Sequence, residues 1–257
     1  FMNLKDSKTL IFPRYHQLTV VRNLLADAKA FGVGKRYLIQ HSAGSGKSNS
    51  IAWLAHQLIG LEHGNKALFD SIIVVTDRRI LDKQIRDTIK QFAQVSATVG
   101  HAEHSGDLRD FLKSGKKIII TTVQKFPFIL DAIGDEHRTG KFAIIIDEAH
   151  SSQGGKTTAA MNRALEESGS NFDAEDTTED KINAIMESRK MVTNASYFAF
   201  TATPKNKTLE IFGAPAPQPD GKVKHYPFHS YTMKQAIQEG FILDVLRNYT
   251  PVESYYR

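Results

Sequence analysis

Five consecutive residues have the composition of a phosphate-binding loop. Gly44, Ser45, Gly46, Lys47 and Ser48 follow a strand-like run at 37–40 and open a helix-like run at 48–59. Glycines let the backbone turn and approach a ligand closely, and the amides of a helix N-terminus attract anions. In such a loop the lysine reaches the β- and γ-phosphates, and the following hydroxyl binds Mg²⁺. The segment therefore predicts a site for ATP and magnesium.

Two carboxylates follow another apolar run. Asp147 ends the run at 142–147, and Glu148 comes directly after it. An aspartate in this position holds Mg²⁺ through water, and the adjacent glutamate polarises the water that attacks the nucleotide. An acidic helix N-terminus is the alternative interpretation. The presence of Lys47 and Ser48 favours the catalytic one.

Two weaker motifs complete the set. Thr201 and Thr203 belong to a TATP sequence after the apolar run at 196–201, and Gln17 lies in a helix-like segment near the N-terminus. Taken alone, the first is typical of an ordinary strand exit and the second of a solvated helix residue. Their order around the phosphate-binding loop and the carboxylates gives them functional meaning.

The elements that position these motifs alternate along the chain. Short apolar runs that are hydrophobic on both faces are typical of buried parallel strands, and amphipathic runs between them predict helices. The predicted strands are 37–40, 71–76, 117–122, 142–147 and 196–201. One predicted helix begins at Pro13, and the others span 48–59, 79–92, 107–112 and 125–132. The alternation predicts an α/β fold with a mostly parallel sheet, whose loops after the strand C-termini carry the function.

Composition narrows the class of protein. Cysteine is absent, so disulfides and cysteine-ligated metals are excluded. The net charge of +5 weakly favours binding to polyanions. No apolar run approaches a membrane span and the first residues do not form a signal peptide, so we expect a cytoplasmic protein without membrane contact. Residues 166–180 are acidic and predict a solvated loop; residues 213–221 hold three prolines and predict another loop.

Together these motifs resemble the first motor domain of superfamily 2 helicases and translocases. Further runs narrow the resemblance: VVTDRRILDKQI at 74–85, IIITTVQKF at 118–126, DEAHSSQGG at 147–155 and SYTMKQAIQEGFILDVL at 230–246. These are similar to the restriction (R) subunit of type I restriction–modification enzymes over nearly the whole chain. Two positions depart from the pattern: His41 replaces the first glycine of a strict phosphate-binding loop, and Ser151 stands where type I subunits often carry arginine.

The resemblance implies a fold and a set of roles. The fold is a three-layer RecA-like P-loop NTPase domain that binds Mg-ATP and double-stranded DNA. Gln17 reads the adenine, with Tyr15 or its neighbours packing the base, and Thr201 and Thr203 link the nucleotide state to strand binding. The side chains implied to touch the phosphates of one DNA strand are Arg78, Arg79, Thr121 and Thr122.

The resemblance also implies an organisation. We expect residues 1–229 to form the first RecA-like domain and residues 230–257 to form a helix–strand extension toward a second motor domain. That second domain and the nuclease residues are expected outside this chain, and the partners are the methylation and specificity subunits of the same enzyme. Three alternatives stay open: the motor of another superfamily 2 helicase or remodeller, an ATP-binding scaffold without turnover, and a small-molecule kinase.

Overall fold

The computed structural model describes residues 2–3, 10–76, 89, 99–102, 105–136, 138–147, 182–184, 186 and 192–244. Its helices are α1 (Tyr15–Phe31), α2 (Lys47–Ile59), α4 (Ser105–Lys113), α5 (Phe126–Asp131), α8 (Asn206–Phe212) and α9 (Met233–Gln238), with a 3-10 turn at Val123–Lys125 and a π turn at Ala132–Glu136. Its strands are β1 (Met2–Asn3), β2 (Leu10–Ile11), β3 (Arg36–His41), β4 (Glu62–His63), β5 (Lys66–Ala67), β6 (Ser71–Thr76), β7 (Val99–His101), β8 (Ile118–Thr122), β9 (Phe142–Ile146), β10 (Ala195–Thr201), β11 (Ala214–Pro217), β12 (Val223–Tyr226) and β13 (His229–Tyr231).

A seven-stranded sheet organises the chain. Its order is β13-β3-β10-β9-β6-β8-β7, and every pair of neighbours is parallel. The predicted parallel sheet is confirmed, and the five predicted strands are found with ends that differ by at most one residue. In a sheet of this kind all strand C-termini meet at one edge, where the loops that follow them lie together.

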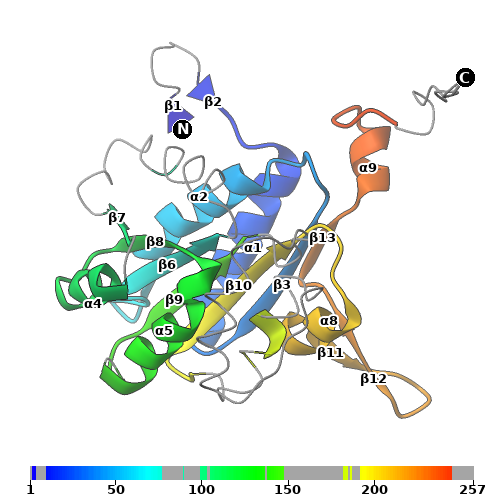
Figure 1. The fold of residues 1–257 in the computed structure, drawn as a ribbon. Helices are drawn as coiled ribbons and strands as arrows, with labels where there is room; N and C mark the ends of the chain where they lie inside the picture. Colours follow the sequence, from blue (N-terminus) through cyan, green and yellow to red (C-terminus); the bar gives the residue numbers. More distant parts are fainter. Residues whose placement is uncertain are drawn as a thin grey trace, which may run out of the picture.

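Helices cover both faces of the sheet (Figure 1). One core joins α1 and α2 to strand residues such as Ile39, Val74 and Phe200. The other core joins α4, α5 and α8 to the strand residues that alternate with these, such as Leu38 and Val75. Because successive side chains of a strand point to opposite faces, a run without polar residues supplies both cores at once. The predicted three-layer architecture is therefore confirmed.

The helices lie near their predicted places. The helix after Pro13, the helix at 48–59 and the short helices at 107–112 and 125–132 correspond to α1, α2, α4 and α5. Of the helix predicted at 79–92, the structure describes Ile89, which is helical and buried. The acidic segment 166–180 lies outside the described residues. Within the described ranges, no helix combines the length and hydrophobicity needed to span a membrane.

The region after residue 213 differs from the prediction. Residues 214–217 form β11, which pairs antiparallel with β12, so the loop predicted at 213–221 is wrong for this part. Prolines are tolerated in an edge strand of a two-stranded sheet because one row of its backbone groups faces away from the partner. The boundary expected after residue 229 falls inside β13, which pairs with β3 in the main sheet.

Candidate functional site

The phosphate-binding loop connects β3 to α2 at the C-terminal edge of the sheet. Gly44 and Gly46 have φ angles of 74° and 80°, in the left-handed region that only glycine adopts without strain. Gly46 is also the N-cap of α2, and its carbonyl accepts from the amides of Asn49 and Ser50 at 3.1 and 3.3 Å. The first amides of a helix have no carbonyl partner within the helix, so they can bind a phosphate.

His41 occupies the position of the missing glycine without strain. It is the last residue of β3, and its φ is not positive, because Asn65 is the single non-glycine residue with positive φ in the described part of the chain. The imidazole is fully buried, and its Nε2 lies 2.9 Å from Nδ1 of His229. The departure from the strict motif therefore leaves the turn of the loop intact.

Lys47 begins α2 inside the site. Its side chain is 8% exposed, and Nζ donates to the carbonyl of Ser42, five residues earlier, at 3.4 Å. This distance is longer than that of an ordinary N–H···O bond. The ammonium group therefore has a weak local contact that a phosphate can replace.

The two motifs expected to act on the nucleotide meet at one edge. Asp147 follows β9, is 3% exposed, and its amide donates to the carbonyl of Val75 at 2.9 Å. Strand β10, which ends at the buried Thr201, lies between β9 and β3. With about 4.8 Å between neighbouring strands, the loop after β3 lies on the order of 10 Å from Asp147. The Ser48 hydroxyl and the Asp147 carboxylate are oxygen donors of the kind that Mg²⁺ prefers.

Gln17 packs against the phosphate-binding loop and is not a solvated helix residue. It is 3% exposed, and its Nε2 donates to the carbonyls of Ser45 and Gly46 at 3.2 and 3.0 Å. Its Oε1 accepts from the amide of Arg14 at 2.8 Å. The side-chain amide thus braces the phosphate-binding loop, and its expected contact with adenine stays a prediction.

The residues expected to touch DNA are only partly described. Thr121 is fully buried, so of the pair at the end of β8 only the half-buried Thr122 offers its side chain to a ligand. Thr203 is exposed beyond β10. Three further site residues, Arg78, Arg79 and Glu148, lie outside the described part of the chain.

A cluster of aromatic and titratable side chains behind the loop was not predicted. The ring of Tyr231 stacks on that of His16, with centroids 3.8 Å apart and planes 6° apart. His16 Nε2 lies 3.0 Å from the carbonyl of Ser45. Glu239 accepts from the hydroxyls of Tyr15 and Tyr231 at 2.6 and 2.7 Å. No signal in the sequence pairs these residues, since they come from opposite ends of the chain.

Burial determines the protonation of this cluster. It lowers the pKa of His41 to about 3, with further contributions from His229, His16 and Lys47. Burial also lowers the pKa of His16 and of His229. The hydrogen bonds from Tyr15 and Tyr231 lower the pKa of Glu239. The imidazoles beside the loop are therefore neutral near pH 7, and the carboxylate is charged.

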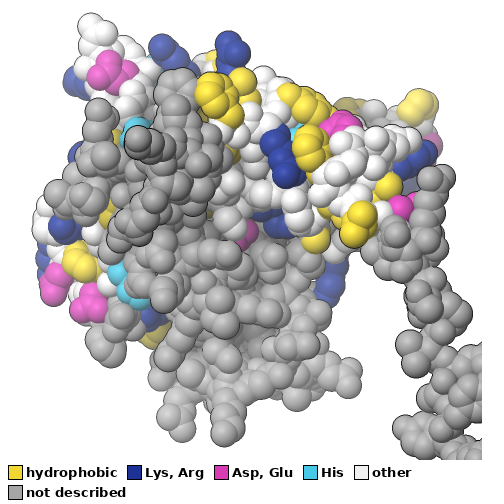
Figure 2. Space-filling model, turned by 90° about the horizontal axis from the view of Figure 1, so that it is seen from above, with side chains coloured by type: hydrophobic (Ala, Val, Ile, Leu, Met, Phe, Trp, Pro, Cys, Tyr) yellow, Lys and Arg dark blue, Asp and Glu magenta, His cyan; other side chains and the backbone are white. Residues whose placement is uncertain are grey.

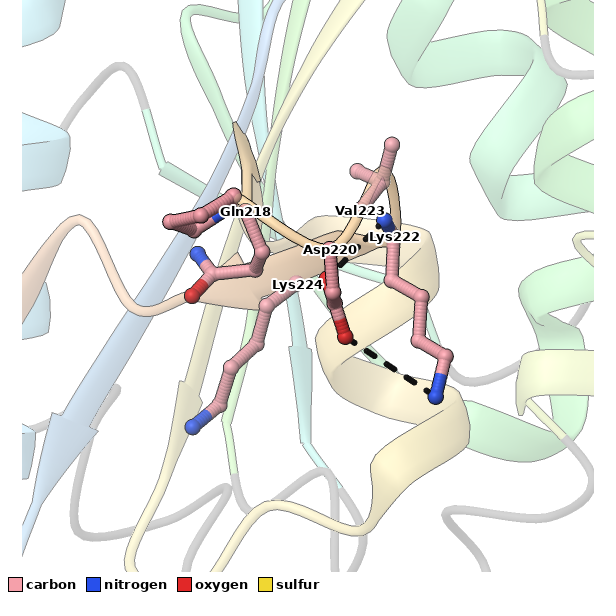
Figure 3. Close-up of a pocket in the computed structure, with 6 residues that line it drawn as sticks. Gln218, Asp220, Lys222, Val223 and Lys224 are labelled. Carbon is pink, nitrogen blue, oxygen red and sulfur yellow. Dashed lines mark hydrogen bonds and ion pairs between the residues drawn. The ribbon is translucent and has the colours of Figure 1, made fainter.

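The described surface has two further features. Seen from above, hydrophobic side chains lie next to those of Lys and Arg on the described part of the surface (Figure 2). Figure 3 shows a polar pocket at the tip of the β11–β12 hairpin, where Asp220 accepts from the amide of Lys222 at 3.1 Å and contacts its Nζ at 3.9 Å. This carboxylate is already paired with an exposed lysine, and the tip lacks the buried polar groups of the phosphate-binding loop. Among the described residues, no group of three His, Cys, Asp or Glu side chains could hold a metal.

Two curated relatives are similar over most of the chain. The type I restriction enzyme SsaAORF53P endonuclease subunit of Staphylococcus saprophyticus is 26% identical over 95% of this chain and 22% of its own length. The putative type I restriction enzyme MjaIXP endonuclease subunit of Methanocaldococcus jannaschii is 27% identical over 82% of this chain and 18% of its own. The expected resemblance to type I R subunits is confirmed, and the chain spans about a fifth of the length of these relatives.

A solved structure and a family match complete the comparison. The ATP-dependent type ISP restriction–modification enzyme LlaBIII, solved bound to DNA, has a TM-score of 0.51 and 16% identity over 91% of this chain and 16% of its own. This likeness supports the fold alone, which is the expected RecA-like domain. The sequence matches the SWI2/SNF2 ATPase family over residues 16–171, which is more than half of the chain. The chain belongs to the SWI2/SNF2 ATPase family.

Proposed function

We propose that this chain is the ATP-driven DNA-translocating part of a type I restriction endonuclease subunit. The observation that carries the proposal is the common edge where the loop around Lys47 and the buried Asp147 follow neighbouring parts of one parallel sheet. A phosphate-binding loop alone fits many nucleotide-binding proteins. An aspartate at the end of a nearby strand adds the metal ligand that ATP hydrolysis requires.

Each group at this edge has a distinct role in the proposal. The backbone of Gly44 and Gly46 and the ammonium group of Lys47 bind the β- and γ-phosphates. The Ser48 hydroxyl and the Asp147 carboxylate hold Mg²⁺, which neutralises charge on the phosphates when it is bound. Glu148 orients a water for attack on the γ-phosphorus and takes its proton, and ADP leaves with the broken bond's electrons. Thr201, on the strand between the two motifs, connects this site to the bound DNA.

The relatives support the proposed substrate and partners. The relatives' names describe endonuclease subunits of type I restriction enzymes. By analogy, we propose that this chain moves along double-stranded DNA in the cytoplasm, together with methylation and specificity subunits, and that a nuclease elsewhere in the subunit cuts. Basic and polar side chains that contact DNA phosphates position a strand without reading its sequence.

Nucleic-acid specificity of ATP turnover tests this proposal. In the complete subunit, duplex DNA should stimulate ATP hydrolysis and RNA should not. Asp147→Ala should abolish the stimulated rate, because it removes a ligand of the metal. Stimulation by RNA would support another superfamily 2 motor, and ATP binding without any stimulated turnover would support a scaffold.

A further inference from the structure

The segment after β12 packs on the phosphate-binding loop through several separate contacts. We name residues 231–242 the C-terminal clasp. The carbonyl of Tyr231 accepts from the amide of Ser42 at 2.9 Å. A Cβ atom added at Gly44 would lie 3.4 Å from the side chain of Ile242. The clasp therefore contacts the chain at Ser42, directly after β3, and at Gly44, the first left-handed glycine of the loop.

Tyr231 extends this contact to the middle of the loop. Its ring is 1% exposed and stacks on His16, whose Nε2 lies 3.0 Å from the Ser45 carbonyl. Stacked rings resist both tilting and sliding, so the orientation of the imidazole is tied to that of the tyrosine. His16 and Gln17 are consecutive in α1, and both bond the carbonyl of Ser45.

Glu239 fixes the outer end of the arrangement. Its two carboxylate oxygens accept one hydroxyl each, from Tyr15 and from Tyr231. Hydrogen bonds to an ionised acceptor are stronger than neutral ones. Next to it, the guanidinium of Arg14 lies 4.0 Å from the ring centre of Phe241. The clasp is therefore joined to the start of α1 at Arg14 and Tyr15 as well as at His16.

We propose that Tyr231 and Glu239 are positioning residues that hold the phosphate-binding loop in the conformation that receives a nucleotide. This inference rests on the proposed function, because it assigns the residues to the same ATP site. Neither side chain belongs to the phosphate-binding loop; both act through His16 and the loop backbone. Since the loop binds the phosphates common to all nucleoside triphosphates, loss of the clasp should weaken ATP and GTP by the same factor.

Equilibrium binding of Mg-ATP and Mg-GTP to the protein tests the inference. Tyr231→Leu removes the stack and should raise both dissociation constants about tenfold, the effect of losing one well-formed interaction. Glu239→Ala removes one exposed and one partly buried hydrogen bond and should raise both dissociation constants about threefold. Glu239→Gln should restore binding to within about twofold, because its amide can accept from one hydroxyl and donate to the other.

Matched variants separate the possible failures. Glu210→Ala is the control for removal of an exposed glutamate, since Glu210 contacts Lys207 on α8 at 3.8 Å and should leave binding unchanged. If Tyr231→Leu does not fold, the comparison of Glu239→Ala with Glu239→Gln decides. The inference is overturned if Glu239→Ala binds ATP like the parent, or if ATP is weakened and GTP is not, while Lys47→Ala loses both. If Lys47→Ala itself binds ATP like the parent, the proposed function fails and the inference falls with it.

Discussion

Lys47 is the side chain on which nucleotide binding should depend most. It is nearly buried, yet its ammonium group makes only a 3.4 Å contact with the carbonyl of Ser42. A phosphate oxygen would offer a charge-assisted bond in the same place, and such bonds contribute about 1.5–3 kcal/mol. Lys47→Ala should therefore weaken Mg-ATP binding by at least about tenfold.

Calorimetric titration with Mg-ATP measures this loss. Lys66→Ala is a suitable control, because Lys66 is an exposed lysine in the β4–β5 hairpin beyond the far end of α2. The control should bind like the parent, and the melting temperature of Lys47→Ala should stay close to that of the parent. Unchanged affinity in Lys47→Ala would remove the phosphate-binding loop from the site.

At the residue scale, Gln17 should have two separable tasks. Its amide already bonds the carbonyls of Ser45 and Gly46, which concerns every nucleotide equally. An amide also offers the donor and the acceptor that match adenine. Gln17→Ala should thus raise the dissociation constants of both ATP and GTP, and that of ATP more. Equal factors in competition binding would limit Gln17 to bracing the loop.

At the scale of elements, the turn from β3 into α2 depends on its glycines. Gly46 has a φ of 80°, and a Cβ added there would collide with the amide of Gln17. A non-glycine residue in the left-handed region costs about 1–2 kcal/mol. Gly46→Ala should lower the melting temperature by about 3–6 °C and should also weaken ATP.

Gly106 provides the comparison for this prediction. It lies in the first turn of α4, its φ is not positive, and an added Cβ would meet nothing within 4 Å. Gly106→Ala should leave the melting temperature unchanged or raise it slightly, because alanine favours helix. Thermal melts of both variants measure the difference. Equal shifts in melting temperature would mean that the left-handed conformation of Gly46 does not require glycine.

The elements also show which parts of the fold were predictable from sequence. Strands β3, β6, β8, β9 and β10 are apolar on both faces, and this local signal marks them clearly. The edge strands β7 and β13 have three residues each, too few to display a pattern. The prolines of β11 suggested a loop, but tertiary pairing with β12 overrides that local preference. The length of an element therefore limits prediction more than its position.

The same distinction holds for the site. Lys47, Ser48 and Asp147 could be proposed as site residues from sequence because each lies in a short motif that follows a predicted strand. The C-terminal clasp could not be predicted, because its contacts join the first helix to a segment more than 200 residues later. Neither segment carries a local pattern that indicates contact with the other. His16 lies beside Gln17 in the sequence, but only its stack on Tyr231 shows what it does.

At the scale of the whole molecule, the buried histidines should make stability depend on pH. Burial lowers the folded-state pKa of His41 to about 3, and lowers those of His16 and His229 as well. The unfolded chain takes up these protons near pH 6.5. Below that pH the unfolded state binds more protons than the folded state, so the free energy of unfolding falls as the pH falls. The stability is fully present above pH 6.5 and is lost progressively toward pH 3.

Chemical denaturation between pH 8 and pH 5 measures this dependence. A group that stays neutral only when folded contributes a slope of about 1.4 kcal/mol per pH unit below its unfolded pKa. His41→Leu fills the buried position with an apolar side chain and removes one histidine that stays neutral only when folded. It should be less stable than the parent at pH 8, because the bond between His41 and His229 is lost. Its slope between pH 6 and pH 5 should nevertheless be shallower by about 1.4 kcal/mol per pH unit. Parallel curves of unfolding free energy against pH for the two proteins would contradict this argument. They would mean that His41 is protonated equally in the folded and unfolded states, so that the imidazole beside the phosphate-binding loop is not held neutral by burial.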